Sequence, residues 1–381
     1  MLARQMSDYD VIVIGVGGMG SATVYELARR GVRVLGLERF DIPHDLGSSH
    51  GVTRIIRLAY WEHPSYVPLL RRAYERWREL ENRRGERLLF VTGSIDAGRA
   101  NSKTVSGSLR SCEVHGLSHE VLDAAALRDR FPAYQLPPEI TAVYQADGGF
   151  LLSERAIVNY VEAAHEAGAE IHAREQVVGW KPVDAGVVVT TSAATYRARR
   201  LVLTAGPWAS TLVPELGALA RPERQVVLWT QPRKPERFRL GAFPVFNMET
   251  ADGHFYGYPI IGIPGFKIGC YHHRREAVSP DQMDRDCHPE DEALLRVGIR
   301  KYFPDADGPT MAMKTCLFTN SPDEHFIIDR HPTLPQVTLA AGFSGHGFKF
   351  CSVVGEVMAD LALEGRTRWD LDLFKLSRFR L

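Results

Sequence analysis

The chain has 381 residues, of which 45% are hydrophobic and 24% are charged. Its 46 lysine and arginine residues balance 46 aspartate and glutamate residues, which argues against a surface built for nucleic acid or for an anionic membrane. No apolar stretch approaches the length of a membrane span. A chain of this length exceeds a usual single domain, so we expect two lobes.

Cysteine and histidine spacing favours neither disulfides nor a metal site. The 5 cysteines are scattered without CxxC spacing, and such a set favours reduced thiols in a cytoplasm. The side chains of His272 and His273 are adjacent and diverge on either a helix or a strand, so no metal is expected. The leader MLARQMS lacks a hydrophobic segment, so we expect no secretory signal, and Met1 and Met6 are alternative starts.

Residues 9–38 carry the most informative pattern of the chain. An apolar run leads into the turn GVGGMG, a helical pattern follows, and a second apolar strand ends at Glu38. Gly15 permits the tight turn, Gly17 lets backbone approach a pyrophosphate, and Gly20 lets helix and strand pack closely. The helix N-terminus offers unpaired N–H groups to the phosphates, and Glu38 is placed to bind ribose hydroxyls. The pattern predicts an adenine dinucleotide, and its spacing suits FAD as well as NAD.

The rest of the chain is predicted to alternate between the two lobes. Ser153 is the expected N-cap of a helix that ends near Ala167. A buried strand at residues 336–341 precedes a glycine-rich loop, which again brings a helix N-terminus toward a cofactor. The nucleotide lobe is therefore discontinuous. Further strands are expected at residues 53–58, 170–196, 200–205, 226–229, 245–248 and 265–271, and further helices at residues 64–83, 290–302 and 350–363.

Two arginines and a lysine are candidates for anion binding. On an extended strand, Arg54 and Arg57 point to opposite faces, so one can face a cofactor while the other meets a substrate carboxylate. Taken alone, such arginines are more often surface charges. Lys349 opens a helix, where a lysine is unfavourable unless it has an anion to meet.

Other candidates are less distinctive on their own. A lone cysteine is most often a small buried hydrophobe, and composition does not raise Cys316 above Cys351. Tyr256 and Lys267 lie in a segment that can place both near a pocket, although aromatic residues in strands usually belong to the core.

Three motifs follow the fingerprint in order, GSSHGVTRIIR, CLFTNSPDEHFIID and AAGFSGHGFKF. Together they resemble the monomeric sarcosine oxidase and N-methyltryptophan oxidase family of amine-oxidising flavoproteins, from Tyr9 to about Gly365. The resemblance implies a two-lobed α/β fold, with a Rossmann-like FAD-binding domain and a discontinuous substrate domain on an antiparallel sheet. The FAD-binding domain is expected at residues 8–90, 148–215 and 312–381, and the substrate domain at residues 91–147 and 216–311.

The resemblance also implies roles for single residues. It places a thioether between Cys316 and the flavin 8α-methyl group, and it places His50 and Arg54 against the flavin ring. Arg57 and Lys349 match the pair that binds the substrate carboxylate. The implied catalytic residues are Lys267 (near flavin N5, promoting reaction with oxygen), His50, Arg54, Tyr256 (also a substrate-pocket residue) and His272. The implied cofactor-binding residues are Gly15, Gly17, Gly20, Glu38, Arg39, Ser48, His50, Arg54, Cys316, Gly345, Gly347 and Lys349.

The sequence departs from the sarcosine-oxidising pattern at two places. Phe318 stands where a tyrosine is expected, and either Tyr271 or His272 takes the place of a pocket histidine. Both departures leave the choice of amine open among sarcosine, N-methyltryptophan and pipecolate. The resemblance implies a monomer that acts on a secondary amino acid with O2.

Other classes of protein remain as alternatives. An NAD-dependent dehydrogenase would use the same fingerprint without needing Cys316. A flavin-binding partner protein without turnover, or a dehydrogenase that passes electrons to another protein, would keep the flavin but not react with oxygen.

Overall fold

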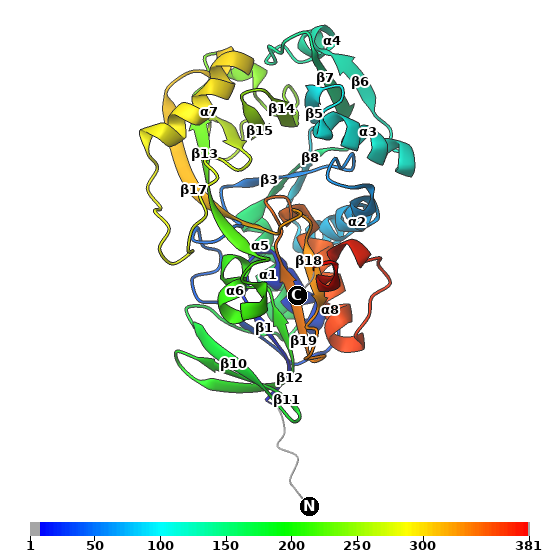
Figure 1. Cartoon of the computed structure of the whole chain (residues 1–381), viewed down its shortest axis with the longest axis vertical. Helices are drawn as coiled ribbons and strands as arrows, with labels where there is room; N and C mark the ends of the chain where they lie inside the picture. Colours follow the sequence, from blue (N-terminus) through cyan, green and yellow to red (C-terminus); the bar gives the residue numbers. More distant parts are fainter. Residues whose placement is uncertain (1–7, 380–381) are drawn as a thin grey trace, which may run out of the picture.

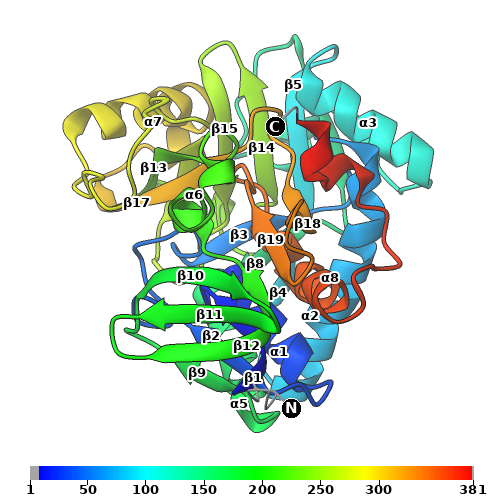
Figure 2. The ribbon, with the colours of Figure 1, turned by 60° about the horizontal axis from the view of Figure 1, so that its bottom comes forward.

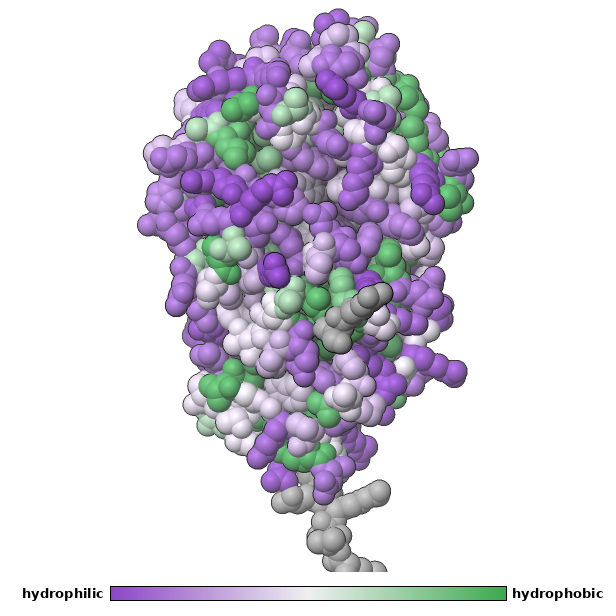
Figure 3. Space-filling view, viewed as in Figure 1, coloured by the Kyte–Doolittle hydropathy of each residue, from purple (hydrophilic) through white to green (hydrophobic). Residues whose placement is uncertain are grey.

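A computed structural model describes residues 8–379, which form two lobes (Figure 1). The choice between Met1 and Met6 as the start lies outside the described residues. Among those residues, no helix is both long and apolar enough to cross a membrane. The face drawn in Figure 3 is covered mainly by hydrophilic residues, with hydrophobic residues in small groups.

The first lobe is built on a sheet in the order β10-β11-β12-β1-β2-β9, with β19 beside β12 and β18 beside β19. The pairs that join β9, β2, β1, β12 and β19 are parallel, which is the arrangement predicted for a Rossmann-like domain. Its strands are β1 (Tyr9–Ile14), β2 (Val34–Leu37), β9 (Glu170–His172), β10 (Val177–Val183), β11 (Gly186–Thr191), β12 (Thr195–Leu203), β18 (Ile327–Arg330) and β19 (Val337–Ala341).

The second lobe is built on a sheet in the order β17-β13-β16-β15-β14-β5-β7-β6. Its pairs are antiparallel except for the parallel pair of β14 and β5. A small sheet of β3, β8 and β4 lies between the lobes (Figures 1 and 2). The strands of these two sheets are β3 (Thr53–Ile56), β4 (Leu89–Val91), β5 (Ser94–Arg99), β6 (Glu120–Asp123), β7 (Ile140–Gln145), β8 (Gly149–Leu152), β13 (Arg221–Thr230), β14 (Val245–Thr250), β15 (Gly253–Tyr258), β16 (Phe266–Cys270) and β17 (Thr310–Asn320).

Helices of the first lobe pack together over the parallel strands, and α3 and α7 flank the second sheet at opposite ends (Figures 1 and 2). The close crossing of α1 and α8 depends on Gly355, where an added Cβ would lie 2.7 Å from the backbone of Ala22. The helices are α1 (Gly18–Ala28), α2 (Val67–Arg84), α3 (Lys103–His115), α4 (Ala124–Arg130), α5 (Ser153–Glu166), α6 (Ala209–Leu212), α7 (Pro289–Tyr302) and α8 (Cys351–Glu364).

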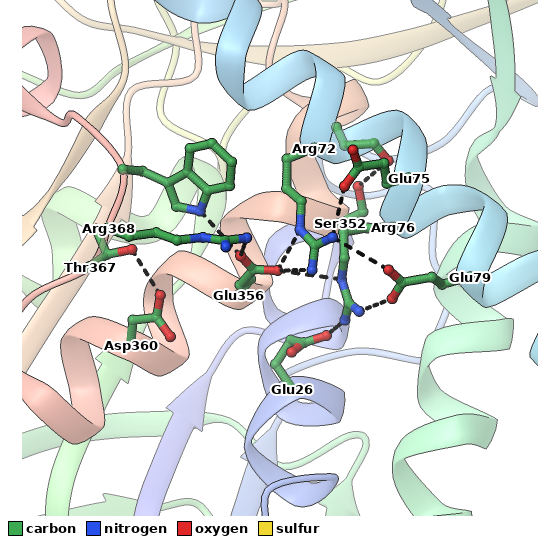
Figure 4. A network of polar contacts seen from close by, with 12 residues as sticks. Glu26, Arg72, Glu75, Arg76, Glu79, Ser352, Glu356, Asp360, Thr367 and Arg368 are labelled. Carbon is green, nitrogen blue, oxygen red and sulfur yellow. Dashed lines mark hydrogen bonds and ion pairs between the residues drawn. The ribbon is translucent and has the colours of Figure 1, made fainter.

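An ion network fastens α1, α2 and α8 to one another (Figure 4). Glu26 of α1 is 1% exposed and pairs with Arg76 of α2. Glu356 of α8 pairs with Arg72 of α2 at 2.7 Å and with Arg76 at 3.7 Å. A buried carboxylate is tolerated only when cations or donors satisfy it, so these pairs fix how the helices pack over the nucleotide sheet.

The predicted α/β fold with two lobes is confirmed, and the expected strands and helices of the middle and end of the chain are found. One local prediction is wrong. Ser153 is the first residue of α5 and Leu152 is its N-cap, because the Ser153 hydroxyl donates to the Glu154 carboxylate at 2.7 Å rather than accepting from the helix backbone. The domain boundaries stay a prediction, and β17, expected in the FAD-binding domain from residue 312 onward, is the edge strand of the second sheet.

Candidate active site

A cavity of about 210 Å³ runs along the fingerprint of the first lobe. Gly15 has a φ of +89°, as the tight turn requires, and an added Cβ on Gly20 would lie 1.7 Å from the Gly15 carbonyl oxygen. By contrast, an added Cβ on Gly17 would find only the Ser49 hydroxyl, at 3.9 Å. The backbone at Gly17 is therefore open to a bound group, beside the N-terminus of α1.

Glu38 lies in the wall of this cavity and is held by backbone donors. Its carboxylate accepts from the Val16 N–H at 2.9 Å and from the Phe40 N–H at 3.1 Å. Arg39 also lines the cavity and pairs with Asp281 at 2.6 Å. Two backbone N–H groups fix the orientation of the acid, which leaves oxygen lone pairs to accept from ribose hydroxyls.

The cavity continues toward the second lobe, where a smaller inner pocket begins. Both cavities are lined by Arg54, Phe318, Gly345 and Phe348. The inner pocket is also lined by His50, Ile55, Val227, Tyr256, Tyr258, Lys267, Tyr271, Cys316, His346 and Lys349. Its residues come from β3, β13, β15, β16, β17 and the loop before α8, so both lobes build it.

The burial and hydrogen bonding of His50 indicate whether these cavities suit a long cofactor. It is 3% exposed, and among residues 8–379 neither ring nitrogen has a hydrogen-bond partner. Burial lowers the pKa of His50 to about 3, so the ring is neutral. A buried imidazole without partners is costly, and a polar ring system reaching from the fingerprint into the inner pocket would supply them. The residues present therefore fit FAD.

Cys316 and Arg54 meet at the junction of the two cavities. The Arg54 guanidinium lies 3.6 Å from the Cys316 sulfur and donates to the Ser48 carbonyl oxygen at 2.7 Å. The Cys316 sulfur therefore has a guanidinium N–H as its direct neighbour. Cys351 lines the cavity along the fingerprint rather than the inner pocket, and burial raises the pKa of its thiol. The structure thus distinguishes Cys316 from Cys351 by their surroundings, whereas composition alone gives no reason to choose between them.

Lys267 is buried beneath the strand that carries Arg54. Its ammonium group donates to the carbonyl oxygens of Gly51, at 2.7 Å, and Thr53, at 3.1 Å. Glu154 holds the same loop from the other side, because its carboxylate accepts from the Gly51 N–H at 2.6 Å. Burial first, and then the nearby Arg54, lower the pKa of Lys267 well below its ordinary value.

Arg57 and Lys349 both lie close to Tyr60. Arg57 donates to Asp96 at 3.2 Å and to Glu62 at 3.0 Å, and its guanidinium carbon lies 4.5 Å from the centre of the Tyr60 ring. Lys349 donates to the Tyr60 hydroxyl at 3.4 Å. Within the described residues, Nη1 of Arg57 has no partner. Both cations thus lie against the same aromatic ring.

The two cations differ in how firmly they hold their charge. Burial opposes the charge of Arg57, but Asp96 and Glu62 raise its pKa above the ordinary value. Burial, reinforced by the repulsion of Arg57, lowers the pKa of Lys349 to about 7. Arg57 is therefore charged throughout the physiological range, whereas Lys349 titrates within it.

Aromatic rings form the remaining wall of the inner pocket. The Tyr256 ring lies over Gly269, where an added Cβ would be 2.4 Å away. The Tyr271 ring centre lies 5.2 Å from that of Tyr256 and 6.0 Å from that of Phe318. The two places where the sequence departs from the sarcosine-oxidising pattern, Phe318 and residue 271, are therefore neighbours.

His272 does not line the inner pocket. It has a φ of +53°, and its ring nitrogens lie 3.0 Å from Glu223 and 3.1 Å from Glu324. These carboxylates raise its pKa to about 9. Tyr271 does line the pocket. It is four positions after Lys267, and residues an even number of positions apart on a strand point to the same face. This spacing was the sequence signal that could have favoured Tyr271 over His272.

Sequence reasoning missed the partners of the buried cations. Asp96 is 2% exposed in β5, and Glu62 follows β3 in a loop. An acid inside the buried strand SIDAGR is a signal that could have identified Asp96. His346 was also missed as a site residue, although it bonds the Tyr60 hydroxyl at 2.6 Å from within a predicted motif.

Comparison with known proteins identifies the relatives of this chain. Residues 10–361 match the family described as DAO, FAD dependent oxidoreductase. The chain is 43% identical over 376 residues to a monomeric sarcosine oxidase of Streptomyces avermitilis, with 97% of each chain covered. It is 37% identical over 374 residues to an N-methyl-L-tryptophan oxidase of Salmonella enteritidis, covering 97% of this chain and 99% of the relative.

Solved structures agree with this relationship. The open form of NikD, an unusual amino acid oxidase essential for nikkomycin biosynthesis, has a TM-score of 0.85 and 26% identity, and the match covers 97% of this chain and 98% of NikD. The family match points to FAD, and the cavity along the fingerprint and the unsatisfied His50 fit that cofactor. The chain belongs to the family of FAD dependent oxidoreductases.

Proposed function

We propose that the protein is a flavin-dependent oxidase of N-methyl amino acids, with sarcosine as its leading substrate. The reaction is sarcosine + O2 + H2O to glycine, formaldehyde and hydrogen peroxide. The observation that carries the proposal is the pair of buried cations against Tyr60, Arg57 and Lys349, of which Lys349 lines the inner pocket next to the cavity that fits FAD. N-methyltryptophan and pipecolate are the alternative substrates.

The chemistry that FAD supplies when bound is acceptance of a hydride equivalent from the carbon next to the amine nitrogen, and its passage to O2. The residues of the chain position the substrate for this. Arg57 and Lys349 hold the carboxylate, which orients the N-methyl carbon. The rings of Tyr256, Tyr271 and Phe318 exclude water from the amine, which favours the reactive free base over the ammonium form.

We further propose that Cys316, beside the Arg54 guanidinium, would hold FAD through a thioether to its 8α-methyl group. The S–H bond and one methyl C–H bond would break as the S–C bond forms, and the flavin itself would be the oxidant that takes up both hydrogens and their electrons. Lys267 is proposed as the group that promotes reaction with oxygen. Carbonyl oxygens surround its ammonium group, and negative charge arriving in the pocket would raise the pKa of Lys267 toward its ordinary value. A monomeric state and a cytoplasmic location remain predictions.

Substrate oxidation is tested with the purified holoenzyme. Sarcosine should yield hydrogen peroxide and formaldehyde in equal amounts, because each turnover releases one of each. N-methyltryptophan and pipecolate are assayed beside it to rank the candidate amines. An enzyme that forms no peroxide from any of these substrates would contradict the proposed function.

Flavin attachment is tested by denaturing the protein in acid. The yellow colour should stay with the polypeptide in the wild type and be released in Cys316→Ala. Cys351→Ala is the matched control, because Cys351 is also a buried free cysteine and lines the cavity along the fingerprint, and this variant should leave the flavin attached. Release from the wild type, or from Cys351→Ala alone, would show that Cys316 is not the site of attachment.

The pH dependence of carboxylate binding tests Lys349. Acetate has no amine, so its affinity reports the cations alone, and the protonated form of Lys349 attracts it. The pKa of Lys349 is about 7, so Lys349 attracts acetate fully well below pH 7 and loses this attraction well above pH 7. The Kd for acetate should therefore rise about 10-fold from about pH 6 to about pH 8. Calorimetry should show no such rise in Lys349→Met, while Lys375→Met, an exposed control, should behave as the wild type.

Oxygen reactivity tests Lys267. Removal of one preorganised group that stabilises developing charge typically costs about 10²- to 10³-fold in rate. We expect Lys267→Met to slow reoxidation of the reduced enzyme by O2 to this extent in stopped-flow experiments, while reduction by substrate changes little. Lys314→Met removes an exposed cation from β17 of the same sheet and should alter neither rate. Equal slowing of both half-reactions in Lys267→Met would assign Lys267 a structural role instead.

A further inference from the structure

Glu154, in the first turn of α5, bonds the turn at residues 51–53, which also binds the ammonium group of Lys267. We propose that Glu154 is a positioning residue for the reaction with oxygen, because it keeps the Lys267 ammonium group in place and in its charged form. The inference rests on the proposed function, since it deepens the role given there to Lys267.

The turn at residues 51–53 has a strained backbone that α5 holds in place. Gly51 has a φ of +92° and Val52 a φ of +74°, and the second value is unusual for a β-branched residue. The Glu154 carboxylate accepts from the Gly51 N–H at 2.6 Å, and both of its oxygens lie 3.0 Å from the Val52 nitrogen. The Ser153 N–H donates to the Val52 carbonyl oxygen at 3.0 Å. Strained conformations persist where the surroundings hold them, so this turn depends on the first residues of α5.

The Lys267 ammonium group is bound by the same turn. It donates to the Gly51 carbonyl oxygen at 2.7 Å, and to the carbonyl oxygen and the hydroxyl of Thr53 at 3.1 Å each. Gly51 thus links the two charged groups, with its N–H on the carboxylate of Glu154 and its carbonyl oxygen on the ammonium group. A change in the turn would therefore move the acceptors that fix the position of Lys267.

The charge of Glu154 also acts on Lys267. Burial and then Arg54 lower the pKa of Lys267, whereas Glu154 and Cys316 raise it. In the proposed thioether the sulfur of Cys316 cannot ionise, which leaves Glu154 as the anion among these groups that favours the ammonium form. Two neutral rings face the ammonium group as well, with centres 4.3 Å and 5.3 Å from its nitrogen, those of Tyr258 and Trp229.

Glu154 is itself held in its charged form. Burial opposes this charge, but hydrogen bonds from Ser153 and Val52 and the charge of Arg54 keep the pKa of Glu154 below its ordinary value. A negative charge is also favourable in the first turn of a helix, where Glu154 lies. Glu154 therefore carries its charge across the physiological range, in which it can support that of Lys267.

The first measurement follows the proton of Lys267 directly. NMR of oxidised holoenzyme with isotope-labelled lysine gives its titration, and the signal is identified by its absence in Lys267→Met. Glu154→Gln keeps a side-chain oxygen but removes the charge, so the midpoint should lie about 1 pH unit lower than in the wild type. Glu162→Gln is the matched control, because Glu162 is an exposed acid of the same helix that pairs with Arg84 instead, and it should leave the midpoint unchanged.

The second measurement is reoxidation of the reduced enzyme by O2 in stopped-flow experiments. A midpoint about 1 unit lower leaves about 10-fold less protonated Lys267 at pH values above both midpoints. Glu154→Gln should therefore reoxidise about 10-fold more slowly in that range, with reduction by sarcosine changed by less than about 2-fold. Glu162→Gln should reoxidise at the wild-type rate.

A second pair of variants covers the case in which Glu154→Gln does not fold. Val52→Gly removes the strain, since glycine adopts a positive φ readily, and it is compared with Val52→Gly/Glu154→Gln, which should again show the lower midpoint. An unchanged midpoint in either comparison, or equal slowing of both half-reactions, would overturn the inference and leave the proposed function standing. A wild type that forms no peroxide from any of the proposed amines would overturn the proposed function and this inference together.

Discussion

The central constraint on this structure is the burial of several cations in one region between the lobes. Arg57, Lys267 and Lys349 are 1%, 2% and 5% exposed. A buried charge is costly unless it is paired or hydrogen-bonded, and the protein meets this cost in different ways. Arg57 has two carboxylates, whereas the lysines have mainly carbonyl oxygens. The arginine therefore has a fixed charge, and each lysine has a charge that depends on what else enters the pocket.

This constraint also explains how the two lobes are held together at the site. Lys267 belongs to β16 of the second lobe, yet its acceptors Gly51 and Thr53 lie at the start of β3. Arg57 follows β3, and its partner Asp96 lies in β5 of the second sheet. The hydrogen bonds of each of these two cations thus join separate pieces of the fold. The loop that carries His50 and the strand that carries Arg54 are positioned by these bonds together with Glu154, so the geometry of the proposed flavin site depends on both lobes.

The sequence predicted the parts of this arrangement that depend on nearby residues. The roles of Gly15 and Gly20 in the turn are set within one strand–turn–helix unit, so spacing alone predicts them. The partner of Arg57 does not follow from spacing, because Asp96 is 39 positions away and meets it only through the pairing of distant strands. Ser153 was misassigned for a similar reason, since Glu154 offers its hydroxyl a better acceptor and is itself held by the distant loop at Gly51.

The choice between Tyr271 and His272 shows how backbone geometry just after the end of β16 determines which side chain lines the inner pocket. His272 has a positive φ and is turned toward two carboxylates, so it is charged and unsuited to a pocket that must keep an amine in its free-base form. Tyr271 retains the direction set by Lys267 and Gly269, and it is neutral, since burial raises the pKa of its hydroxyl. With neutral rings around the proposed amine position and Arg57 already balanced by Glu62 and Asp96, the net charge that the proposed substrate carboxylate would meet depends on Lys349. Binding of that carboxylate and protonation of Lys349 would therefore favour each other, because each would lower the cost of burying the other charge.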